Sequence, residues 1–197
     1  FRDGERTSFD YLIQDKYIND TVELDLLRKN KMITLTVKLS KPSHDLRLVP
    51  YEEYDVAPTY FILGGLVFQP LTVNFLKLWG DKWHHEASKN LLNQYYYGQP
   101  AAGKREIVVL SKVLADEINV GYHNVHDKIV YYVNDKRIAN MNDLVNAFES
   151  YEGKYHVILD EMGHRIVLEK KKVDENGRSI LQKYGINSDR SRDLMHW

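Results

Sequence analysis

Two stretches of the chain alternate between apolar and polar residues in the manner of antiparallel β-hairpins. In residues 21–38, apolar residues occupy every second position on both sides of a polar turn: Val22, Leu24, Leu26, Ile33, Leu35 and Val37. Residues 154–172 carry a second pattern of this kind. Because successive side chains of a strand point to opposite faces, these patterns predict two hairpins, the first with one buried face.

Each predicted hairpin follows a predicted amphipathic helix, at residues 8–16 after Thr7 or Ser8 as a candidate cap, and at residues 140–153. The chain therefore contains an internal repeat, 8–39 and 141–170. Matched residue numbers differ by 133 in the hairpins and by 132 in the helices: Leu24 with Val157, Leu26 with Leu159, Ile33 with Ile166, Leu35 with Leu168, Leu12 with Leu144 and Ile13 with Val145. The first copy lacks the strands that precede the second, so it corresponds to half a domain.

Residues 60–70, YFILGGLVFQP, are nearly all apolar and carry Gly64 and Gly65 near the middle. The run is too short to cross a bilayer as a helix, which needs roughly 20 apolar residues. The glycine pair also weakens a helix. The stretch therefore predicts an apolar strand.

The remaining patterns complete the predicted order of elements. Residues 74–104 predict two short helices, broken near Gly80 and ended by Gly98 and Pro100. Residues 105–115 and 127–138 predict strands, the second with an Asn-Asp turn. Residues 42–58 contain three prolines and predict a linker, and residues from 173 onward predict a charged, partly helical tail.

The order of elements in residues 59–172 resembles a PDZ domain: a Gly-containing loop that leads into a strand, further strands, a helix and a closing hairpin. The stretch DKIVYYVNDKRIANMNDLVNAF resembles the PDZ pattern G-D-x-I-x-x-V-N-G-x-x-V and the helix after it, with His126 and Asp135 in place of the two glycines. The stretches FRDGERTSFDYLI, VPYEEYDVAPTYFILGGLVFQPLT and VLSKVLADEINVGY are similar to the C-terminal part of Do-like (Deg/HtrA) serine proteases of the plant and organellar type.

This resemblance implies an α+β fold of PDZ-like, partly open β-barrels or sandwiches with capping helices. It divides the chain into the C-terminal part of a first PDZ domain at 1–41, the linker at 42–58, an atypical second PDZ domain at 59–172 and the charged tail at 173–197. The second PDZ domain would carry the helical insertion at about 74–104.

In PDZ domains the backbone N–H groups of the Gly loop bind a partner's terminal carboxylate, and the next strand offers its open edge to the partner as an added strand. The resemblance assigns the loop and the start of the edge to six residues: Leu63, Gly64, Gly65, Leu66, Val67 and Phe68. It makes Asn142, Val145 and Phe148 candidates for the helical wall of the groove. The apolar residues at 60–63 support an alternative, in which 60–70 is a buried core strand whose glycines permit close packing.

Composition narrows the classes of function. Lys and Arg number 27 against 28 Asp and Glu, so there is no global basic field to attract nucleic acid. Cys is absent, which excludes disulfides, thiolate catalysis and Cys-ligated zinc. No signal sequence follows Phe1, so we expect a fragment or a processed product.

We do not expect the catalytic chemistry of a Do-like protease in this chain. Such an enzyme uses a Ser nucleophile, a His base, an Asp and a backbone oxyanion hole, and the family places its Ser in a G-N-S-G-G stretch. No Ser here has that context, and G-x-S-x-G is absent as well. We therefore expect a catalytic domain upstream of Phe1 and no proteolysis by this chain alone.

Two stretches place nitrogen and oxygen ligands at short spacing and are candidate metal sites: His84, His85 and Glu86 in residues 83–87, and His123, His126 and Asp127 in residues 123–127. The motif H-E-x-x-H is absent, and adjacent histidines on a helix point about 100° apart. We therefore expect no metal and no cofactor.

Aromatic residues concentrate in the predicted insertion. They predict either an interface with another protein or a small core of the insertion itself, and the interface candidates are Trp79, Trp83, Tyr95, Tyr96 and Tyr97.

Three hypotheses of function follow. The first is a regulatory region of a Do-like serine protease that binds peptide or unfolded-protein substrates, or other partners, and controls assembly. The second is a structural oligomerisation module whose PDZ groove is filled internally, and the third is an independent enzyme with a His/Asp site. The expected partners are substrates, the protein's own protease domain and further copies of the chain, with no nucleic acid and no membrane span. The resemblance implies an organelle (mitochondrion or plastid) or the nucleus, with the bacterial periplasm as the alternative.

Overall fold

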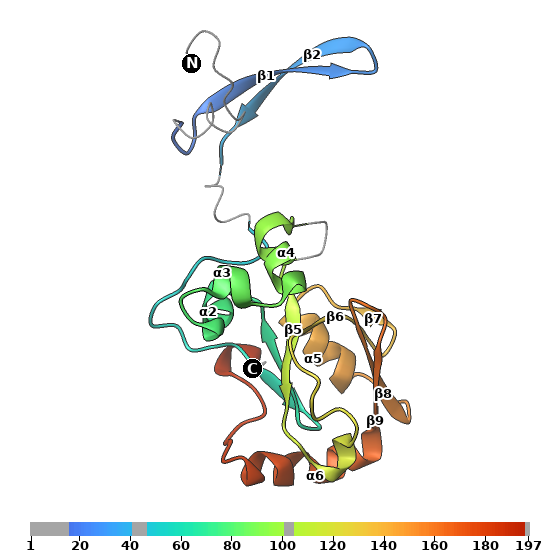
Figure 1. Cartoon of the computed structure of the whole chain (residues 1–197). Coiled ribbons are helices and arrows are strands. Elements are labelled where there is room, and N and C mark those ends of the chain that lie inside the picture. The colour runs from blue at the N-terminus through green and yellow to red at the C-terminus, as the bar shows by residue number, and fades with distance from the viewer. Residues whose placement is uncertain (1–15, 41–46, 101–104, 196–197) are drawn as a thin grey trace. The chain divides into compact units, whose positions relative to one another are not determined.

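The computed structural model describes residues 16–40, 47–100 and 105–195. The chain forms two compact units, Phe1–Leu46 and Arg47–Trp197, and each is described by itself (Figure 1). In the described ranges, no helix is long and apolar enough to cross a membrane.

The described part of the first unit is the predicted β-hairpin, but the face that was expected to be buried is largely exposed: Leu26, Ile33, Leu35 and Val37 are between 38% and 44% exposed. β1 (Thr21–Arg28) pairs antiparallel with β2 (Lys31–Lys38). The turn residues Lys29 and Asn30 have positive φ angles of 52° and 56°. Such a two-residue turn matches the twist of two paired strands, so the turn fixes the register. Residues 8–15 of the predicted helix lie outside the described residues.

The two hairpins match each other in their strand pairing. The offset of 133 residues that the sequence predicts for the first strand of the hairpin, however, is wrong. The facing pairs are Leu24 with Leu35 and Leu26 with Ile33 in the first hairpin, and His156 with Leu168 and Ile158 with Ile166 in the second. The predicted matches of Leu24 with Val157 and of Leu26 with Leu159 are therefore wrong by one residue. The second hairpin is therefore one residue longer than the first. We place this additional residue in the turn, because an additional residue inside a strand would move the buried side chains of that strand to the exposed face.

Seven strands of the second unit form one antiparallel sheet in the order β3-β4-β5-β6-β8-β9, with β7 paired to β6. They are β3 (Phe61–Leu63), β4 (Leu66–Pro70), β5 (Val108–Val113), β6 (Lys128–Val133), β7 (Lys136–Arg137), β8 (Tyr155–Asp160) and β9 (Arg165–Glu169). Asn134 and Asp135 form the predicted turn between β6 and β7, with φ angles of 50° and 64°. The sheet is open and several helices accompany it, as the predicted α+β fold requires.

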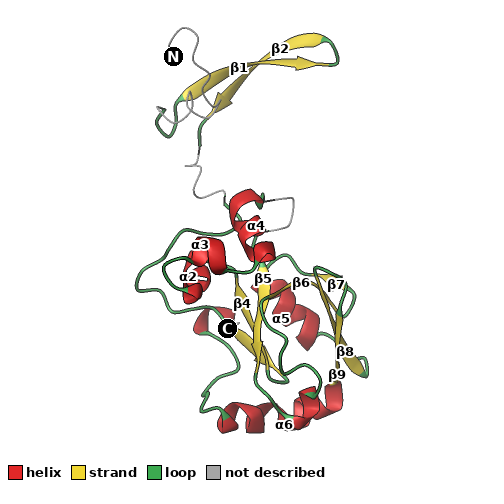
Figure 2. Ribbon diagram, in the orientation of Figure 1, coloured by secondary structure: helices red, strands yellow, loops and turns green. Residues whose placement is uncertain are grey.

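Helix α5 (Met141–Glu149) lies at the centre of the main core. It begins after Asn140, whose side-chain oxygen accepts the backbone N–H of Asp143 at 2.8 Å, a standard N-cap bond. Its buried residues recur at the spacing of one helix face: Met141, Leu144, Val145, Ala147 and Phe148. Strands from both halves of the sheet contribute to the same core, so the sheet curves around α5 (Figure 2).

The predicted insertion contains α2 (Val73–Leu76), the 3-10 turn η2 (Lys77–Trp79), α3 (Trp83–Glu86) and α4 (Lys89–Tyr97). Gly80 follows η2 and Gly98 follows α4, as predicted. The insertion packs over the sheet in a second core, which includes Val109 of β5 and Ile129 of β6. This second core also contains Leu48 and Val49, each 2% exposed. Part of the predicted linker 42–58 is therefore packed into the second unit.

Residues 173–194, which the sequence predicts as a charged tail, complete the second unit. Helix α6 (Lys170–Lys183) buries Val173 and Ile180, and the 3-10 turn η4 (Arg192–Leu194) buries Leu194. A further 3-10 turn, η3 (Glu117–Asn119), contacts both α6 and β9. The expected domain end at Lys172 is therefore corrected, because three apolar residues beyond it belong to the cores of the unit.

Candidate peptide-binding groove

Gly64 and Gly65 form the two-residue turn that joins β3 to β4. Their φ angles are 57° and 85°, and Leu63 lies opposite Leu66 across the turn. Glycine adopts such positive φ angles without the steric cost of a side chain. The predicted single strand at 60–70 is therefore a tight hairpin.

Both glycines of this turn are closely packed. A Cβ atom on Gly64 would lie 2.8 Å from Cδ1 of Leu168, and one on Gly65 would lie 2.5 Å from the carbonyl oxygen of Leu114. The buried Asn119 donates from Nδ2 to the carbonyl oxygens of Gly64 and Leu114, at 2.9 Å each. The alternative that the glycines permit close packing therefore describes the turn, and a role in carboxylate binding stays a prediction.

β4 is an inner strand of the sheet. It pairs with β5 on one side and with β3 on the other, where Phe61 lies opposite Phe68 and Ile62 opposite Val67. The prediction that Val67 and Phe68 begin an open edge is therefore wrong. The edge is closed because the chain reverses at the glycine pair and the residues before it become the neighbouring strand.

Helix α5 faces this hairpin, as the predicted groove wall does. Val145 and Phe148 are buried, whereas Asn142 is exposed. The ring centroid of Phe148 lies 5.6 Å from that of Phe68 on β4 and 6.0 Å from that of Phe61 on β3. A peptide that paired antiparallel with β4 and ended at the glycine turn would take the position that β3 holds.

A second segment covers the outer edge of β3. We call residues 188–194 the C-terminal strap. The N–H of Ile62 donates to the carbonyl of Asp189 at 2.7 Å, and the N–H of Ser191 donates to the carbonyl of Tyr60 at 3.0 Å. The strap therefore pairs with β3 through an isolated antiparallel bridge between Arg190 and Phe61, which no pattern in the sequence predicts.

Side chains fix the strap to its neighbours. The guanidinium of Arg190 lies 2.7 Å from a carboxylate oxygen of Glu149 at the end of α5, and it stacks over the ring of Phe61 at 5.0 Å. The hydroxyl of Thr59 donates to Asp193 at 2.6 Å. The strap is thus held to both sides of the site, α5 and β3.

The aromatic residues of the insertion divide into two groups. Trp79, Trp83 and Tyr95 pack against the second core, which the insertion shares with the sheet, and the rings of Trp83 and Tyr95 are 5.2 Å apart in a T-shaped contact. Tyr96 and Tyr97 are 51% and 74% exposed. The packing favours a local core for the first three, and an interface role stays a prediction for Tyr96 and Tyr97.

The histidine stretches show ordinary surface contacts. His84 and His85 are exposed on α3, and Nδ1 of His126 lies 2.6 Å from a carboxylate oxygen of Asp127. In the described part of the chain, no three acidic, His or Cys side chains are grouped as a metal ion would require.

A buried histidine lies behind the groove wall. His156 on β8 is 1% exposed and makes a T-shaped contact with the ring of Phe148 at 5.2 Å. Its Nδ1 lies 3.1 Å from Nδ2 of Asn134, so the neutral imidazole can accept a hydrogen bond there. Burial lowers the pKa of His156, and the positive charge of Lys170 lowers it further, while Asp174 opposes them.

We expect the stability of the second unit to depend on His156 below neutral pH. Because the folded-state pKa lies below the unfolded value of 6.5, the unfolded state binds more protons, and the free energy of unfolding falls as the pH drops through about 6.5. Denaturant titrations from pH 7.5 to 5 should show a steeper loss for the wild type than for His156→Gln. The variant His85→Gln, changed at an exposed position, should follow the wild type, and equal slopes for all three proteins would contradict the assignment.

Comparisons with known proteins agree with this architecture. The family model for the PDZ domain matches residues 49–193. The chain is 33% identical over 195 residues to protease Do-like 2, chloroplastic, of Arabidopsis thaliana, covering 99% of this chain and 31% of that protein. It is 29% identical over 224 residues to the serine protease DegP homolog of Plasmodium falciparum, covering 96% and 25%. It is 30% identical over 152 residues to protease Do-like 4, mitochondrial, of Arabidopsis thaliana, covering 76% and 26%. The chain thus spans between a quarter and a third of the length of these relatives.

Proposed function

The chain belongs to the PDZ domain family as it occurs in Do-like serine proteases, and we propose that it forms the regulatory region of such a protease. In this proposal residues 1–41 end a first PDZ domain, and the second unit is an atypical second PDZ domain. Proteolysis is assigned to a catalytic domain elsewhere in a longer parent protein. The names of the relatives, which are those of proteases, support this assignment, as does the share of their length that the chain spans.

We infer that the second PDZ domain acts as a fixed building block for assembly, with its groove filled by its own chain. The observation that carries this inference is the pairing of β3 with the groove side of β4, with Phe61 against Phe148. The strap supports it, because it pairs with the remaining edge of β3. Peptide or unfolded-protein substrates are then bound by other parts of the parent protein.

The first unit fits the role of an incomplete domain. Its hairpin exposes Leu27 and Met32 by 70% and 68%, and Leu35 on the other face by 44%. Exposed apolar side chains on both faces of one hairpin are more than a folded domain normally leaves uncovered in one place. We propose that the remaining part of the first PDZ domain covers these apolar side chains.

An organelle is the compartment that we propose. Two of the relatives carry the words chloroplastic and mitochondrial in their names. These names favour a plastid or a mitochondrion over the nucleus and the periplasm.

A peptide titration tests the filled groove. We expect no saturable change in fluorescence polarisation when the full chain is added to labelled peptides that end in an apolar residue with a free carboxylate. The reason is that β3 already holds the backbone groups of β4 that such a peptide would pair with. Peptides with an amidated C-terminus serve as the matched control. Saturable binding that amidation abolishes, and that maps to β4, would contradict the proposal.

A shortened chain that ends at Asn187 separates the two covering segments. If β3 fills the groove, removal of the strap leaves peptide binding at β4 absent. If the strap alone closes the site, the shortened chain gains carboxylate-dependent binding, and the domain is then a regulated peptide receptor.

A further inference from the structure

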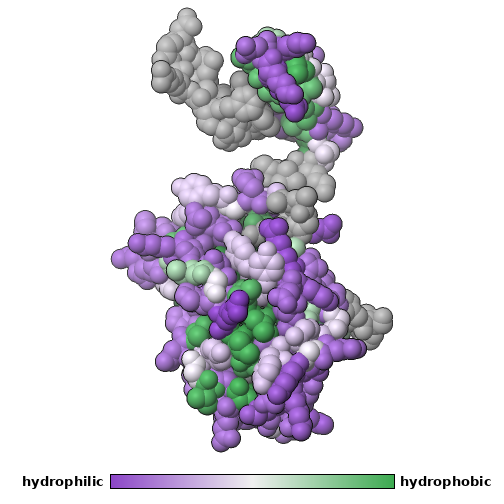
Figure 3. All heavy atoms as spheres, turned by 90° about the vertical axis from the view of Figure 1, so that its right-hand side faces the viewer, coloured by the Kyte–Doolittle hydropathy of each residue, from purple (hydrophilic) through white to green (hydrophobic). Residues whose placement is uncertain are grey.

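The outer face of β6, β8 and β9 is more apolar than a solvent-facing sheet requires. Tyr132 lies opposite Leu159, and Val157 opposite Val167, so these four side chains form two adjacent cross-strand pairs. Tyr132 and Val167 are 39% and 41% exposed, and Tyr155, next on β8, is 43% exposed. Figure 3 shows apolar residues gathered on this side of the second unit. We call these five residues the outer patch.

The first hairpin shows that the fold does not need an apolar outer pair. By the corrected match, Asp25 and Thr34 stand where Val157 and Val167 stand in the second hairpin. There the hydroxyl of Thr34 donates to the carboxylate of Asp25 at 2.7 Å. The first hairpin therefore has a polar pair at the position where the second hairpin has an apolar pair. Because the fold does not require apolar residues there, we infer that the apolar pair contacts a partner surface.

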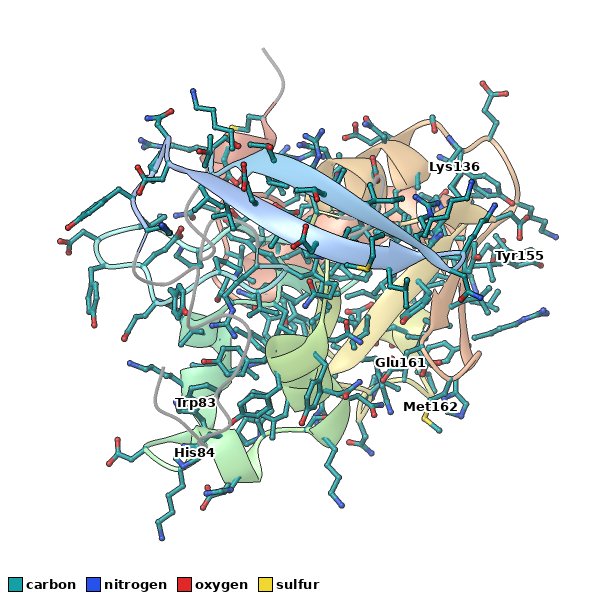
Figure 4. The ribbon with its side chains drawn as sticks, turned by 90° about the horizontal axis from the view of Figure 1, so that it is seen from above. Trp83, His84, Lys136, Tyr155, Glu161 and Met162 are labelled. Atoms are coloured by element: carbon teal, nitrogen blue, oxygen red, sulfur yellow. The ribbon has the colours of Figure 1, made fainter. Side chains whose placement is uncertain are left out.

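Basic side chains surround the outer patch. Arg137 lies opposite Tyr132 and Arg165 lies opposite Leu159, so an arginine stands on either side of the first pair. Nζ of Lys154 lies 5.1 Å from the ring centroid of Tyr155. Lys136 on β7 is exposed as well, and Figure 4 shows it on the same side of the unit as Tyr155, away from Trp83 and His84.

The carboxylates of the neighbouring strand ends already have partners. The contacts are Glu169 with Lys172 at 3.5 Å, Asp160 with His164 at 2.8 Å and Glu161 with the N–H of Ile129 at 2.8 Å. Glu161 keeps its negative charge, because its partner is a neutral N–H, but the basic side chains Lys136, Arg137, Lys154 and Arg165 outnumber it. The patch therefore combines apolar area with an excess of positive charge, which suits an acidic segment that carries apolar side chains.

The second unit carries such a segment itself. We call residues 51–56, YEEYDV, the acidic loop. Glu53 and Asp55 are exposed, and Tyr54 and Val56 between and beside them are 76% and 62% exposed. Glu52 in the same loop, unlike Glu53 and Asp55, already forms an ion pair within the unit, with Lys77.

Within one copy the acidic loop and the outer patch lie on opposite sides of the second unit (Figure 1). The loop of one copy can therefore meet only the patch of another. We propose that the outer patch binds the acidic loop of a second copy of this chain, with Arg137 and Arg165 facing Glu53 and Asp55, and with Tyr54 and Val56 against Val157 and Val167. This head-to-tail contact uses two different surfaces, so it closes into a ring when the rotation allows it.

The proposal rests on the assembly role proposed above and names the surfaces that carry it. A charge exchange tests it in the full chain. We expect the wild type to associate with rising concentration in sedimentation velocity, and we expect Arg137→Glu with Arg165→Glu to weaken association by about tenfold or more. Glu53→Arg with Asp55→Arg should weaken it equally. An equimolar mixture of the two double variants should associate again, because each reversed surface then meets its complement.

The control is Lys171→Glu with Arg178→Glu, which makes the same change of charge on the exposed side of α6 and should associate like the wild type. The variant Val157→Asp with Val167→Thr copies the polar pair of the first hairpin and leaves both arginines in place. It should also weaken association. This variant tests the proposal if an arginine variant does not fold. A wild type that stays monomeric, or a mixture that does not associate, overturns the proposal. Neither result bears on the peptide titration of the groove, so the two proposals fail separately.

Discussion

Replacement of Gly65 by alanine is expected to lower the free energy of unfolding of the second unit by roughly 3–5 kcal/mol. The new Cβ atom would lie 2.5 Å from Nδ2 of Asn119 and 2.5 Å from the carbonyl oxygen of Leu114. These two groups are hydrogen-bonded to each other, and the same Nδ2 also holds the carbonyl of Gly64. Relief of the overlap therefore requires the loss of buried hydrogen bonds, in addition to the strain of alanine at a φ of 85°.

Gly163→Ala is the matched control for backbone strain. Gly163 has a φ of 82°, and a Cβ atom there would have no neighbour within 4 Å. We expect this variant to lose only about 1–2 kcal/mol. Urea unfolding of both variants measures the difference, which isolates the packing around the glycine turn. Equal losses would show that the turn is not closely packed and would reopen its assignment as an accessible loop.

The glycine turn also shows how far the sequence could predict the site. Two glycines that interrupt an apolar run mark the residues around the turn, and the apolar spacing and the cap of α5 are local features that predict this helix. The reversal of the chain at Gly64 was missed because β3 and β4 have only three and five residues. Both are largely buried, so they lack the alternation that identifies a hairpin. A glycine pair between two apolar segments is nevertheless a known hairpin signal.

The strap could not be predicted from any local pattern. Its residues are mostly polar or charged, and its partners on β3 lie more than 120 residues earlier in the chain. Among the described residues beyond Ile180, Leu194 is the one buried apolar side chain, and the other contacts of the strap are backbone bonds and the polar contacts of Arg190 and Asp193. Contacts of this kind leave no periodic signal in a sequence.

The repeat was detectable because apolar residues at the facing positions of both hairpins are similar, but its alignment was not. Leu24 corresponds to the buried His156, which an alignment by hydrophobicity passes over in favour of Val157. Turn length decides the register of a hairpin. The apolar character of the outer pair, Val157 and Val167, became informative only after this correction.

Asn134 stands in the sequence that resembles the PDZ pattern, and the structure gives it a mechanical role. Its Oδ1 accepts the N–H of Val157 at 2.9 Å, and its Nδ2 donates to the carbonyl of Ala147 at 2.9 Å. One buried side chain thus joins the turn after β6 to β8 and to α5. Asn134 is 7% exposed, so water does not replace these bonds when the side chain is removed.

Asn134→Ala is therefore expected to lower the free energy of unfolding by roughly 3–5 kcal/mol, because it leaves a donor on β8 and an acceptor on α5 buried without partners. Alanine at a φ of 50° contributes a part of this loss. Asp135→Ala measures that part, since Asp135 occupies the next position of the same turn at a φ of 64° and is exposed. We expect a loss of about 1–2 kcal/mol for Asp135→Ala.

The removal of Nδ2 should also shift the titration of His156 in NMR spectra of Asn134→Ala and leave it unchanged in Asp135→Ala. Equal unfolding free energies for the two variants, together with an unchanged His156 titration, would show that the bonds of Asn134 do not hold α5 to the sheet.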